Sequence, residues 1–444
     1  MPCKRYNPKF TMPEEELTMN LPASITTYLN EADERLKHHP KLQQLFRNCF
    51  PNTLETTTKL LEDGTTFVFT GDIPAMWLRD STEQVRHYIP FAKNDPELQR
   101  ILRGLIARQM FYVNIDPYTN AFNETASDKH YRDTDDCNLN PWMWERKYEL
   151  DSLCFVVQLA YMYWKEAEQR DIFDAACYQA LTSIVNVIET EQYHGEKSPY
   201  HFIRQTLQDT ETLHNNGRGM PVNYTGMSWS GFRPSDDSCE FGYNIPSNMF
   251  AVVILGYIRE IASEVYMDER LAARAAKLRK EIDFGIRTYG IVTHPKYGRI
   301  YAYETDGFGN YSLMDDAGTP GLMSIPYIGY VGVEDEIYQN TRRFALSFDN
   351  PFYFEGKHAK GIGSPHTPGG YVWHMALSMQ ALTADNDEEI KELIDMLIRT
   401  DADTGYMHEG FHPDDPADFS REWFAWSNSL FATLIGKAMD KGLF

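Results

Sequence analysis

The feature that most limits how this chain can fold is a helical period that recurs along almost its whole length. In residues 23–38, for example, Ile25, Leu29 and Ala32 fall at steps of three and four, as one face of an α-helix requires. The same period predicts helices at 41–61, 82–91, 95–116, 144–169, 172–192, 247–266, 268–289, 335–347, 370–384, 387–399 and 420–441. Strand patterns are short, as at 65–70 and 297–304. The chain is therefore predicted to be mostly α-helical.

Long polar loops separate many of these helices. They cover residues 117–141, 195–246, 303–326, 350–369 and 400–419, and each is rich in Gly, Pro, Asp and aromatic residues. In a compact protein, loops longer than ~15 residues are usually functional. About twelve helices with elaborated connections predict an all-α fold, an (α/α)6 barrel of two concentric rings with a cleft at one end, although periodicity alone leaves a helical solenoid open. We find no linker and no internal repeat, so residues 1–444 are predicted to form one domain.

Composition and charge exclude several classes of protein. With 42% hydrophobic and 24% charged residues, the 444-residue chain can bury a large core. A formal net charge of −22 repels phosphate backbones and anionic lipids, so nucleic acid is not an expected partner. The longest apolar runs, such as 248–257, are far short of the ~20 residues that span a bilayer, so no membrane partner is expected. The first residues include no apolar stretch, and a cytoplasmic location is expected by default.

Cysteine and histidine spacing indicates neither a metal centre nor a disulfide framework. The cysteines are scattered without CxxC spacing and are predicted to be free thiols: Cys3, Cys49, Cys137, Cys154, Cys177 and Cys239. The histidine-rich loops lack HExxH or another tight ligand spacing; they contain His358, His366, His374, His408 and His412. We therefore expect no metal and no cofactor.

Aromatic residues make up 14% of the chain, and many lie in polar stretches, which suits either a sugar-binding cleft or a large core. One such stretch, residues 70–82, combines Asp72, Trp77, Arg79 and Asp80 in a turn that leads into a predicted helix. An Arg–Asp pair beside an indole offers fixed donors, a fixed acceptor and an apolar wall for vicinal hydroxyl groups. The alternative is that Asp80 caps the helix.

A second polar segment, residues 227–238, places Asp236 and Asp237 side by side after Arg233. Neighbouring side chains rarely point the same way, so one of the two carboxylates can face a cleft while the other caps the backbone. A solvated turn is the alternative interpretation.

A third segment, residues 405–413, places Glu409 among aromatic and imidazole side chains between two glycines. This is an unusual setting for a carboxylate in a surface loop. Glu422 is a rival, although Arg421 beside it and a helix start at Ser420 make a capping role at least equally good.

Several long strings in the same order resemble glycoside hydrolase family 125, a family of exo-acting α-1,6-mannosidases. These are Gly71-Asp-Ile-Pro-Ala-Met-Trp-Leu-Arg-Asp-Ser81, Trp229-Ser-Gly-Phe-Arg-Pro-Ser-Asp-Asp237 and Gly363-Ser-Pro-His-Thr-Pro368, with the region of Glu409 and Glu422. The resemblance implies an (α/α)6 barrel and metal-independent hydrolysis with inversion. It also implies that the substrate is non-reducing terminal α-1,6-linked mannose, as in N-glycan-derived oligosaccharides.

The resemblance also implies roles for single residues. The general acid falls in the Arg-Pro-Ser-Asp-Asp string, where we favour Asp236 over Asp237, and the general base falls at Glu409, with Glu422 as the alternative. Arg79 and Asp80 would line the subsite for the terminal sugar. The full set of residues expected to bind substrate is Asp72, Trp77, Arg79, Asp80, Arg233 and His366.

The residue types fit this mechanism, since inverting glycosidases use two carboxyl groups ~6.5–9.5 Å apart. We expect burial or a nearby negative charge to raise the pKa of Asp236 and keep it protonated, while Glu409 is ionised.

Two alternative functions stay open. One is an inverting exo-glycosidase or phosphorolytic enzyme acting on another α-linked sugar, and a phosphorolytic enzyme would need a basic pocket. The other is a non-catalytic carbohydrate-binding protein of the same fold, which would need neither carboxylate.

Overall fold

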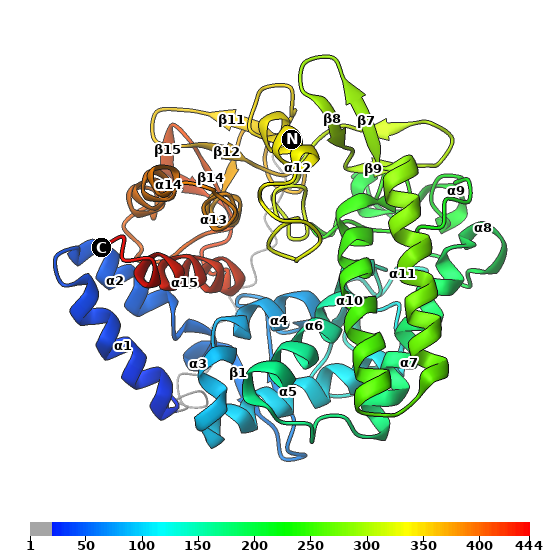
Figure 1. Ribbon diagram of the computed structural model, residues 1–444, viewed down its shortest axis with the longest axis horizontal. Helices are drawn as coiled ribbons and strands as arrows, with labels where there is room; N and C mark the ends of the chain where they lie inside the picture. The colour runs from blue at the N-terminus through cyan, green and yellow to red at the C-terminus, as the bar shows by residue number, and fades with distance from the viewer. Residues whose placement is uncertain (1–19) are drawn as a thin grey trace.

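Helices of two kinds alternate along the chain in the computed structural model, which describes residues 20–444 (Figure 1). One kind is buried on nearly all sides: α4 (Leu78–Arg86), α6 (Leu150–Ala167), α10 (Ile245–Glu264), α13 (His374–Leu382) and α15 (Ala425–Asp440). The other kind buries one apolar face and exposes a polar one: α2 (Pro40–Cys49), α5 (Pro96–Ile115), α7 (Ala175–Glu191), α11 (Glu269–Tyr289), α12 (Glu336–Ala345) and α14 (Asp387–Arg399). This difference is the one expected between an inner and an outer ring.

The inner helices form a closed ring. Helix α6 packs between α10 and α4, and α15 packs between α4 and α13, which joins the last helix to the first inner one. The sixth inner position, between α10 and α13, is occupied by consecutive turns in residues 321–330 (Figure 1). In this segment Tyr327 donates a hydrogen bond of 3.0 Å from its hydroxyl to Glu83 of α4. The predicted (α/α)6 barrel is confirmed, with one inner helix replaced by turns.

Short strands precede the inner helices at one end of the barrel. They form three small antiparallel sheets, with the orders β3-β4-β5, β10-β9-β6 and β13-β14-β15. The strands are β3 (Met76–Trp77), β4 (Ala121–Phe122), β5 (Met143–Glu145), β6 (Tyr243–Asn244), β9 (Glu304–Thr305), β10 (Tyr311–Ser312), β13 (Val372–Trp373), β14 (Gly410–His412) and β15 (Asp415–Phe419). The long loops predicted from the sequence therefore enter the N-terminal ends of the inner helices.

The remaining elements lie around this frame. Helix α1 (Ala23–Leu36) packs on α2. Three hairpins pair β1 (Thr58–Leu60) with β2 (Thr66–Val68), β7 (Ile291–His294) with β8 (Gly298–Tyr301), and β11 (Tyr353–Glu355) with β12 (Lys360–Ile362). The short helices are α3 (Asn52–Thr56), α8 (His194–Lys197), α9 (His214–Gly217) and the 3-10 turns Ile89–Asn94 and Asp209–Glu211.

Several predicted helix boundaries are wrong for local physical reasons. The predicted helix at 41–61 is split at Pro51, because proline cannot continue the hydrogen-bond ladder, and its last part is β1. The predicted helix at 420–441 begins only at Ala425, because the chain up to Phe419 pairs in β15. Helix α14 begins at Asp387 as predicted, and its N-cap is the preceding Asn386, which accepts a hydrogen bond of 2.8 Å from the Glu389 N–H.

Helix α4 begins earlier than predicted, at Leu78 rather than 82, and α6 begins at Leu150 rather than 144 because residues up to Glu145 form β5. Of all the described helices, α10 is long and apolar enough to cross a membrane by length and composition, with a mean hydropathy of 1.3. However, 72% of that window is buried inside the barrel, as in the core helix of a soluble protein.

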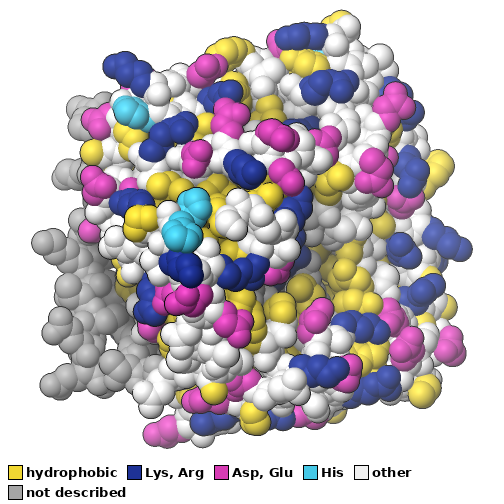
Figure 2. Space-filling view, turned by 60° about the vertical axis from the view of Figure 1, so that its left-hand side comes forward, with side chains coloured by type: hydrophobic (Ala, Val, Ile, Leu, Met, Phe, Trp, Pro, Cys, Tyr) yellow, Lys and Arg dark blue, Asp and Glu magenta, His cyan; other side chains and the backbone are white. Residues whose placement is uncertain are grey.

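On the face in Figure 2, basic side chains are interspersed with acidic ones.

The cysteines behave as predicted where they are described. Cys49, Cys137, Cys154, Cys177 and Cys239 are free and buried. Cys3 lies outside the described residues. Burial raises the pKa of Cys49 and Cys177, the latter to about 12, so these two thiols stay protonated at neutral pH.

Candidate active site

Asp236 lies in a tight loop at the entrance to the inner ring. Phe232 and Ser238 form an isolated antiparallel bridge that closes this loop. Asp236 itself has a φ of +70°, in the left-handed region that residues other than glycine rarely adopt. Its side chain keeps 25% exposure, whereas that of Asp237 is 1% exposed. Of the two adjacent carboxylates, Asp236 is therefore the one that can reach a ligand.

Four hydrogen bonds to the carboxylates of Glu304 and Asp316 fix this loop. Arg233 donates from Nε to Glu304 Oε1 at 2.5 Å, and the other oxygen of Glu304 accepts hydrogen bonds from the backbone N–H groups of Glu240 and Phe241. Ser235 Oγ donates to Asp316 Oδ2 at 2.5 Å. Arg233, predicted as a substrate ligand, is 6% exposed and ion-paired, so its position is that of a support for the loop.

Arg79 joins the Asp236 loop to the inner helices. From the first turn of α4 its Nη2 donates to Asp236 Oδ1 at 2.8 Å, while its Nη1 donates to Glu149 Oε2 at 2.7 Å and to Asp151 Oδ2 at 3.2 Å. Asp80 Oδ2 lies 3.7 Å from Arg79 Nε. Glu149 and Asp151 have fully buried side chains at the start of α6. The guanidinium thus faces four carboxyl groups rather than offering free donors to a sugar.

These contacts set the protonation of the cluster. Burial opposes ionisation of Asp236, but the charge of Arg79 and a hydrogen bond from Glu149 outweigh it and hold the pKa of Asp236 well below its usual range. Burial raises the pKa of Glu149 well above its usual range, against the attraction of Arg79, and the charge of Asp236 raises it further. The expectation of a raised pKa at Asp236 is therefore wrong for the unliganded protein. The proton of this pair lies on Glu149.

Asp80 and Asp151 are also affected by burial. Burial raises the pKa of Asp80 to about 6, partly offset by Arg79 and assisted by the charge of Asp236. Asp151 likewise reaches a pKa of about 6 through burial, again against Arg79. The predicted capping role of Asp80 is not observed: the N-cap of α4 is Trp77, which makes no side-chain cap within residues 20–444.

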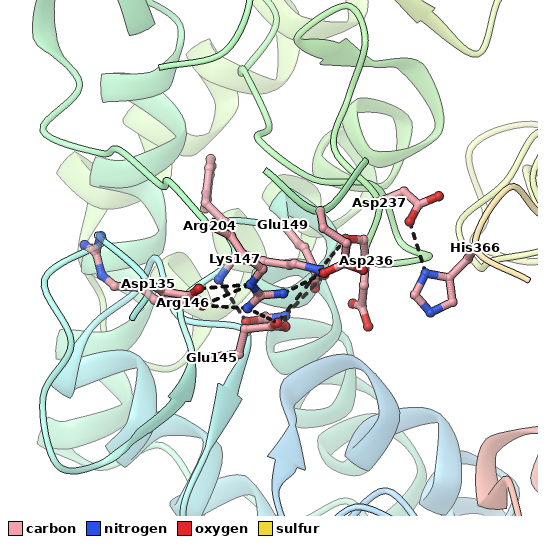
Figure 3. Close-up of polar contacts among 12 residues, drawn as sticks. Asp135, Glu145, Arg146, Lys147, Glu149, Arg204, Asp236, Asp237 and His366 are labelled. Atoms are coloured by element: carbon pink, nitrogen blue, oxygen red, sulfur yellow. Dashed lines mark hydrogen bonds and ion pairs between the residues drawn. The ribbon is translucent and has the colours of Figure 1, made fainter. Parts of the chain in front are cut away.

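A second basic group supports Asp236 from the backbone side (Figure 3). Lys147 donates from Nζ to the Asp236 carbonyl oxygen at 2.8 Å and to Glu211 Oε2 at 3.3 Å. Arg204 then holds Glu211 at 2.6 Å and Glu145 at 2.8 Å. This network of buried charges anchors the loop to β5 and to the segment that contains Glu211.

Asp237 points away from Asp236 toward His366 (Figure 3). Asp237 Oδ1 lies 3.1 Å from His366 Nδ1. Burial alone would lower the pKa of His366, but its hydrogen bond to Asp237 and the charges of Asp237, Glu409 and Asp236 raise it to about 10. His366 is therefore a cation that faces the charges of both predicted catalytic carboxylates.

Glu211, Asp237 and His366 together bring three potential metal ligands within 4.8 Å of one another. A metal ligand must be the neutral imidazole. In this structure His366 contacts Asp237 at 3.1 Å and Lys147 contacts Glu211 at 3.3 Å, so the three side chains form part of an ion-pair cluster.

Glu409 lies directly before β14. Ser420 Oγ donates to its Oε2 at 3.0 Å, and Arg421 Nη1 lies 3.4 Å from its Oε1. Arg421 is held by Asp72, whose Oδ1 lies 2.6 Å from Arg421 Nη2. The side chain of Glu409 is 8% exposed.

Glu422 is exposed on the surface, and its backbone carbonyl oxygen accepts a hydrogen bond from His408 at 3.1 Å. The structure thus places Glu409, not Glu422, among the charged groups of the site.

Trp77 lies beneath the site rather than in the open. It is 5% exposed and packs with Ala75 and Ala121 through the β3–β4 pair. A second indole, Trp426 in the first turn of α15, lies 5.7 Å from the Arg79 guanidinium. Both indole N–H groups are buried without a hydrogen-bond partner among the described residues.

The structure therefore brings Asp72, Arg79, Asp80, Asp236, His366 and Glu409 to one end of the barrel, with Trp77 and Arg233 as buried supports. Sequence reasoning missed Lys147, Glu149 and Asp151, although charged residues immediately before an apolar helix were a usable signal. It treated Arg421 only as a neighbour of Glu422. No local pattern reveals its pairing with Asp72, which lies 349 residues earlier.

Comparison with known proteins agrees with this geometry. A solved structure from Streptococcus pneumoniae, described as a metal-independent α-mannosidase in a non-productive substrate complex with α-1,6-mannobiose, is 47% identical. It superposes with a TM-score of 0.92, and the match covers 94% of this chain and 98% of that one. The Meiotically up-regulated gene 157 protein of Schizosaccharomyces pombe is 40% identical over 440 residues, which is 94% of this chain and 86% of the relative.

More distant structures share the fold alone. A glucoamylase from Saccharomycopsis fibuligera, 11% identical, has a TM-score of 0.57 over 98% of this chain and 99% of its own. The model of glycoside hydrolase family 125, described as metal-independent α-mannosidases, matches residues 39–436. This chain therefore belongs to glycoside hydrolase family 125.

Proposed function

We propose that the protein is an exo-acting α-1,6-mannosidase that removes non-reducing terminal mannose with inversion, using Asp236 as general acid and Glu409 as general base. The observation that carries this proposal is that two carboxylates on separate loops lie at the same end of the barrel, Asp236 held by Arg79 at 2.8 Å and Glu409 beside Arg421 at 3.4 Å. One of them, Asp236, keeps a partly exposed side chain, and the other, Glu409, has a hydrogen-bond donor near each oxygen.

In this mechanism Asp236 delivers a proton to the oxygen of the leaving group. Glu409 removes a proton from a water molecule that attacks the anomeric carbon from the opposite face of the ring. Because the attack comes from the opposite face, the α-linked substrate gives β-mannose. Arg421 and Ser420 orient the base, and Arg79 and Lys147 orient the acid.

The choice of an α-1,6-linked substrate is supported by the Streptococcus pneumoniae relative, whose complex contains α-1,6-mannobiose. The phosphorolytic alternative is disfavoured because the cations of the site are already engaged by carboxylates: Arg79 by Glu149, Asp151 and Asp236, Arg421 by Asp72 and Glu409, and Lys147 by Glu211. A phosphate would have to displace them.

The proposal is tested by incubating the protein with α-1,6-, α-1,2- and α-1,3-linked mannobiose and measuring the mannose released. We expect release from the α-1,6 isomer to be fastest. Equal rates on all three, or a preference for another linkage, would contradict the proposed specificity. A rate that rises in the presence of inorganic phosphate, with mannose 1-phosphate as the product, would instead indicate phosphorolysis.

A further inference from the structure

One guanidinium and four carboxyl groups meet at the start of α4 and α6. Arg79 faces Asp80 from its own helix, Glu149 and Asp151 from the start of α6, and Asp236 from the loop. Three of these carboxyl side chains are at most 6% exposed: Asp80, Glu149 and Asp151. An uncompensated buried charge is costly. Asp236 is also near Lys147 and His366, and Asp80 is also near Arg421, whereas Arg79 is the cation that contacts the fully buried pair Glu149 and Asp151. Burial of two carboxyl groups against one cation favours a proton on one of them.

We propose that Glu149 stores the proton that Asp236 delivers, so that the two side chains act as one acid in which Asp236 is the donor and Glu149 the reservoir. This inference rests on the proposed role of Asp236 as general acid. Glu149 does not contact the substrate in this scheme, and it is a positioning and proton-holding residue.

The contacts of Glu149 leave one oxygen for the proton. Its Oε2 accepts hydrogen bonds from Arg79 at 2.7 Å and from Ser152 Oγ at 2.8 Å. Its Oε1 has a weaker contact of 3.3 Å with Asn120 Nδ2, which also donates to Glu145. Oε1 is therefore free to carry the proton, and the Glu149 carboxyl hydrogen-bonds the Asp236 carboxylate.

The shared Arg79 guanidinium lowers the free-energy cost of moving a proton from Glu149 to Asp236. Glu149 contacts Arg79 Nη1 and Asp236 contacts Nη2. When the proton moves from Glu149 to Asp236, the negative charge moves from one nitrogen of the same cation to the other, so the ion pair is kept. In the free protein the proton lies on the buried member, where a charge would be most costly.

The protons balance over one turnover. Glu149 passes its proton to Asp236 as Asp236 gives one to the glycosidic oxygen, and Glu149 becomes the carboxylate. Glu409 takes a proton from the attacking water and later releases it to solvent. After the product leaves, solvent returns a proton to Asp236, which is the exposed member of the pair, and the proton passes back to Glu149.

Glu149→Gln tests this proposal, because glutamine keeps the shape and the contacts with Arg79 and Asp236 but cannot transfer a proton. We expect kcat/KM for α-1,6-mannobiose to fall at least about tenfold, whereas α-mannosyl fluoride, whose leaving group needs no proton, is hydrolysed at nearly the wild-type rate. We also expect activity on mannobiose to be lost at a lower pH than in the wild type, by roughly one unit or more. The reason is that Asp236 alone, beside Arg79, loses its proton earlier as the pH rises.

Asp151→Asn is the matched control, because Asp151 is equally buried and contacts the same Arg79 nitrogen. It should affect both substrates alike and shift the alkaline limit of activity less than Glu149→Gln does, because it removes a neighbouring charge that raises the pKa of Glu149 but leaves the proton carrier in place. If Glu149→Gln behaves like this control, Glu149 is only structural and the proposal is wrong.

Asp236→Asn, assayed in parallel, separates failure of this proposal from failure of the proposed function. If Asp236→Asn slows the two substrates equally, Asp236 is not the general acid, and both proposals fall. If Asp236→Asn spares the fluoride but Glu149→Gln does not, the storage role alone is overturned.

A measurement on the wild type avoids any dependence on how the variants fold. In unliganded protein labelled with ¹³C at the glutamate carboxyl carbons, NMR should show one glutamate that is still protonated at pH 7. If every glutamate is ionised at pH 7, no proton is stored on Glu149 and the proposal is contradicted.

Discussion

The outer and inner helices begin in different ways. Five outer helices start at an Asp or Asn whose side chain accepts hydrogen bonds from the first backbone N–H groups: Asp95, Asp174, Asp268, Asp335 and Asn386. Four inner helices instead start at Trp77, Glu149, Trp373 and Phe424, which make no side-chain cap within residues 20–444, and only α10 is capped, by Asn244.

This difference separates stability from function. Five of the six outer helices complete their hydrogen bonds locally, as capping requires; the exception is α2, which begins at Pro40 after His39 and has no side-chain cap within residues 20–444. The inner helices leave the positive ends of their dipoles toward the end of the barrel where carboxylates gather, and such ends stabilise nearby negative charge. Changes at the inner N-termini should therefore alter chemistry and pH dependence, whereas changes at the outer caps should alter stability alone.

The largest expected effect is at Glu409. Glu409→Gln should lower kcat by about 10²–10⁴-fold on mannobiose and on α-mannosyl fluoride alike, because water must be activated whatever group leaves. Initial rates on the two substrates provide the measurement. Glu422→Gln is the control, because this exposed side chain has the same chemistry and should keep nearly full activity. Loss of activity in the control with activity retained in Glu409→Gln would reverse the assignment.

Arg79→Ala should affect both stability and activity. The substitution leaves Glu149, Asp151 and Asp236 without their cation, and breaking a buried ion pair costs about 3–5 kcal/mol of unfolding free energy. The loss should be smaller at pH 5 than at pH 7.5, because protonated carboxyl groups do not need the cation. Urea unfolding at the two pH values measures it. An unchanged stability would mean that Arg79 is free to act mainly as a sugar ligand.

Asp80→Asn should change stability and activity in opposite directions. The pKa of Asp80 is raised to about 6 in the folded protein, so its ionised form destabilises the fold and stability falls as the pH rises from about 4 to about 6. Asparagine removes this penalty, so the variant should be about 1–3 kcal/mol more stable than the wild type at pH 7.5 and equally stable at pH 4. Its kcat/KM should nevertheless fall. Thermal melts showing lower stability at pH 7.5 would argue against this interpretation.

The smallest effect is expected at an outer cap. Asp95 accepts hydrogen bonds from Glu97 N–H at 3.1 Å and Leu98 N–H at 3.0 Å. Burial opposes ionisation, but these bonds and one from Ser24 lower the pKa of Asp95, so its contribution is present at neutral pH and is lost as the pH falls below about 4. Asp95→Ala should cost about 1 kcal/mol at pH 7 and leave kcat/KM unchanged. A change in kcat/KM would break the distinction between the two rings.

The sequence predicted the outer helices better than the inner ones. Outer helices such as α11 show their amphipathic stripe directly, and the predicted range 268–289 differs from the observed one by a single residue. The first turn of α4 was missed because Arg79 and Asp80 are polar. Both are nevertheless buried, and Arg79 pairs with carboxyl groups of Glu149, Asp151 and Asp236 from other segments. Periodicity cannot reveal a buried helix whose charges are satisfied by distant segments.

The candidate site was predicted in the same uneven way. Asp236 and Glu409 stood out because their local sequence is unusual, and the structure adds the left-handed backbone that turns Asp236 outward and Asp237 inward. Glu149 lies directly before an apolar helix, but no local pattern reveals its contact with Arg79, which lies 70 residues earlier. Protonation within such a cluster depends on burial and on contacts across the fold, which neither composition nor spacing encodes.

The central claim, inversion by Asp236 and Glu409, is tested most directly by following the wild-type reaction with proton NMR from its first minutes. Hydrolysis of α-1,6-mannobiose should give β-mannose first, before mutarotation produces the α-anomer. Immediate appearance of α-mannose would mean retention, with the carboxyl groups only ~5–5.5 Å apart and a covalent intermediate, and the roles assigned to both residues would be wrong.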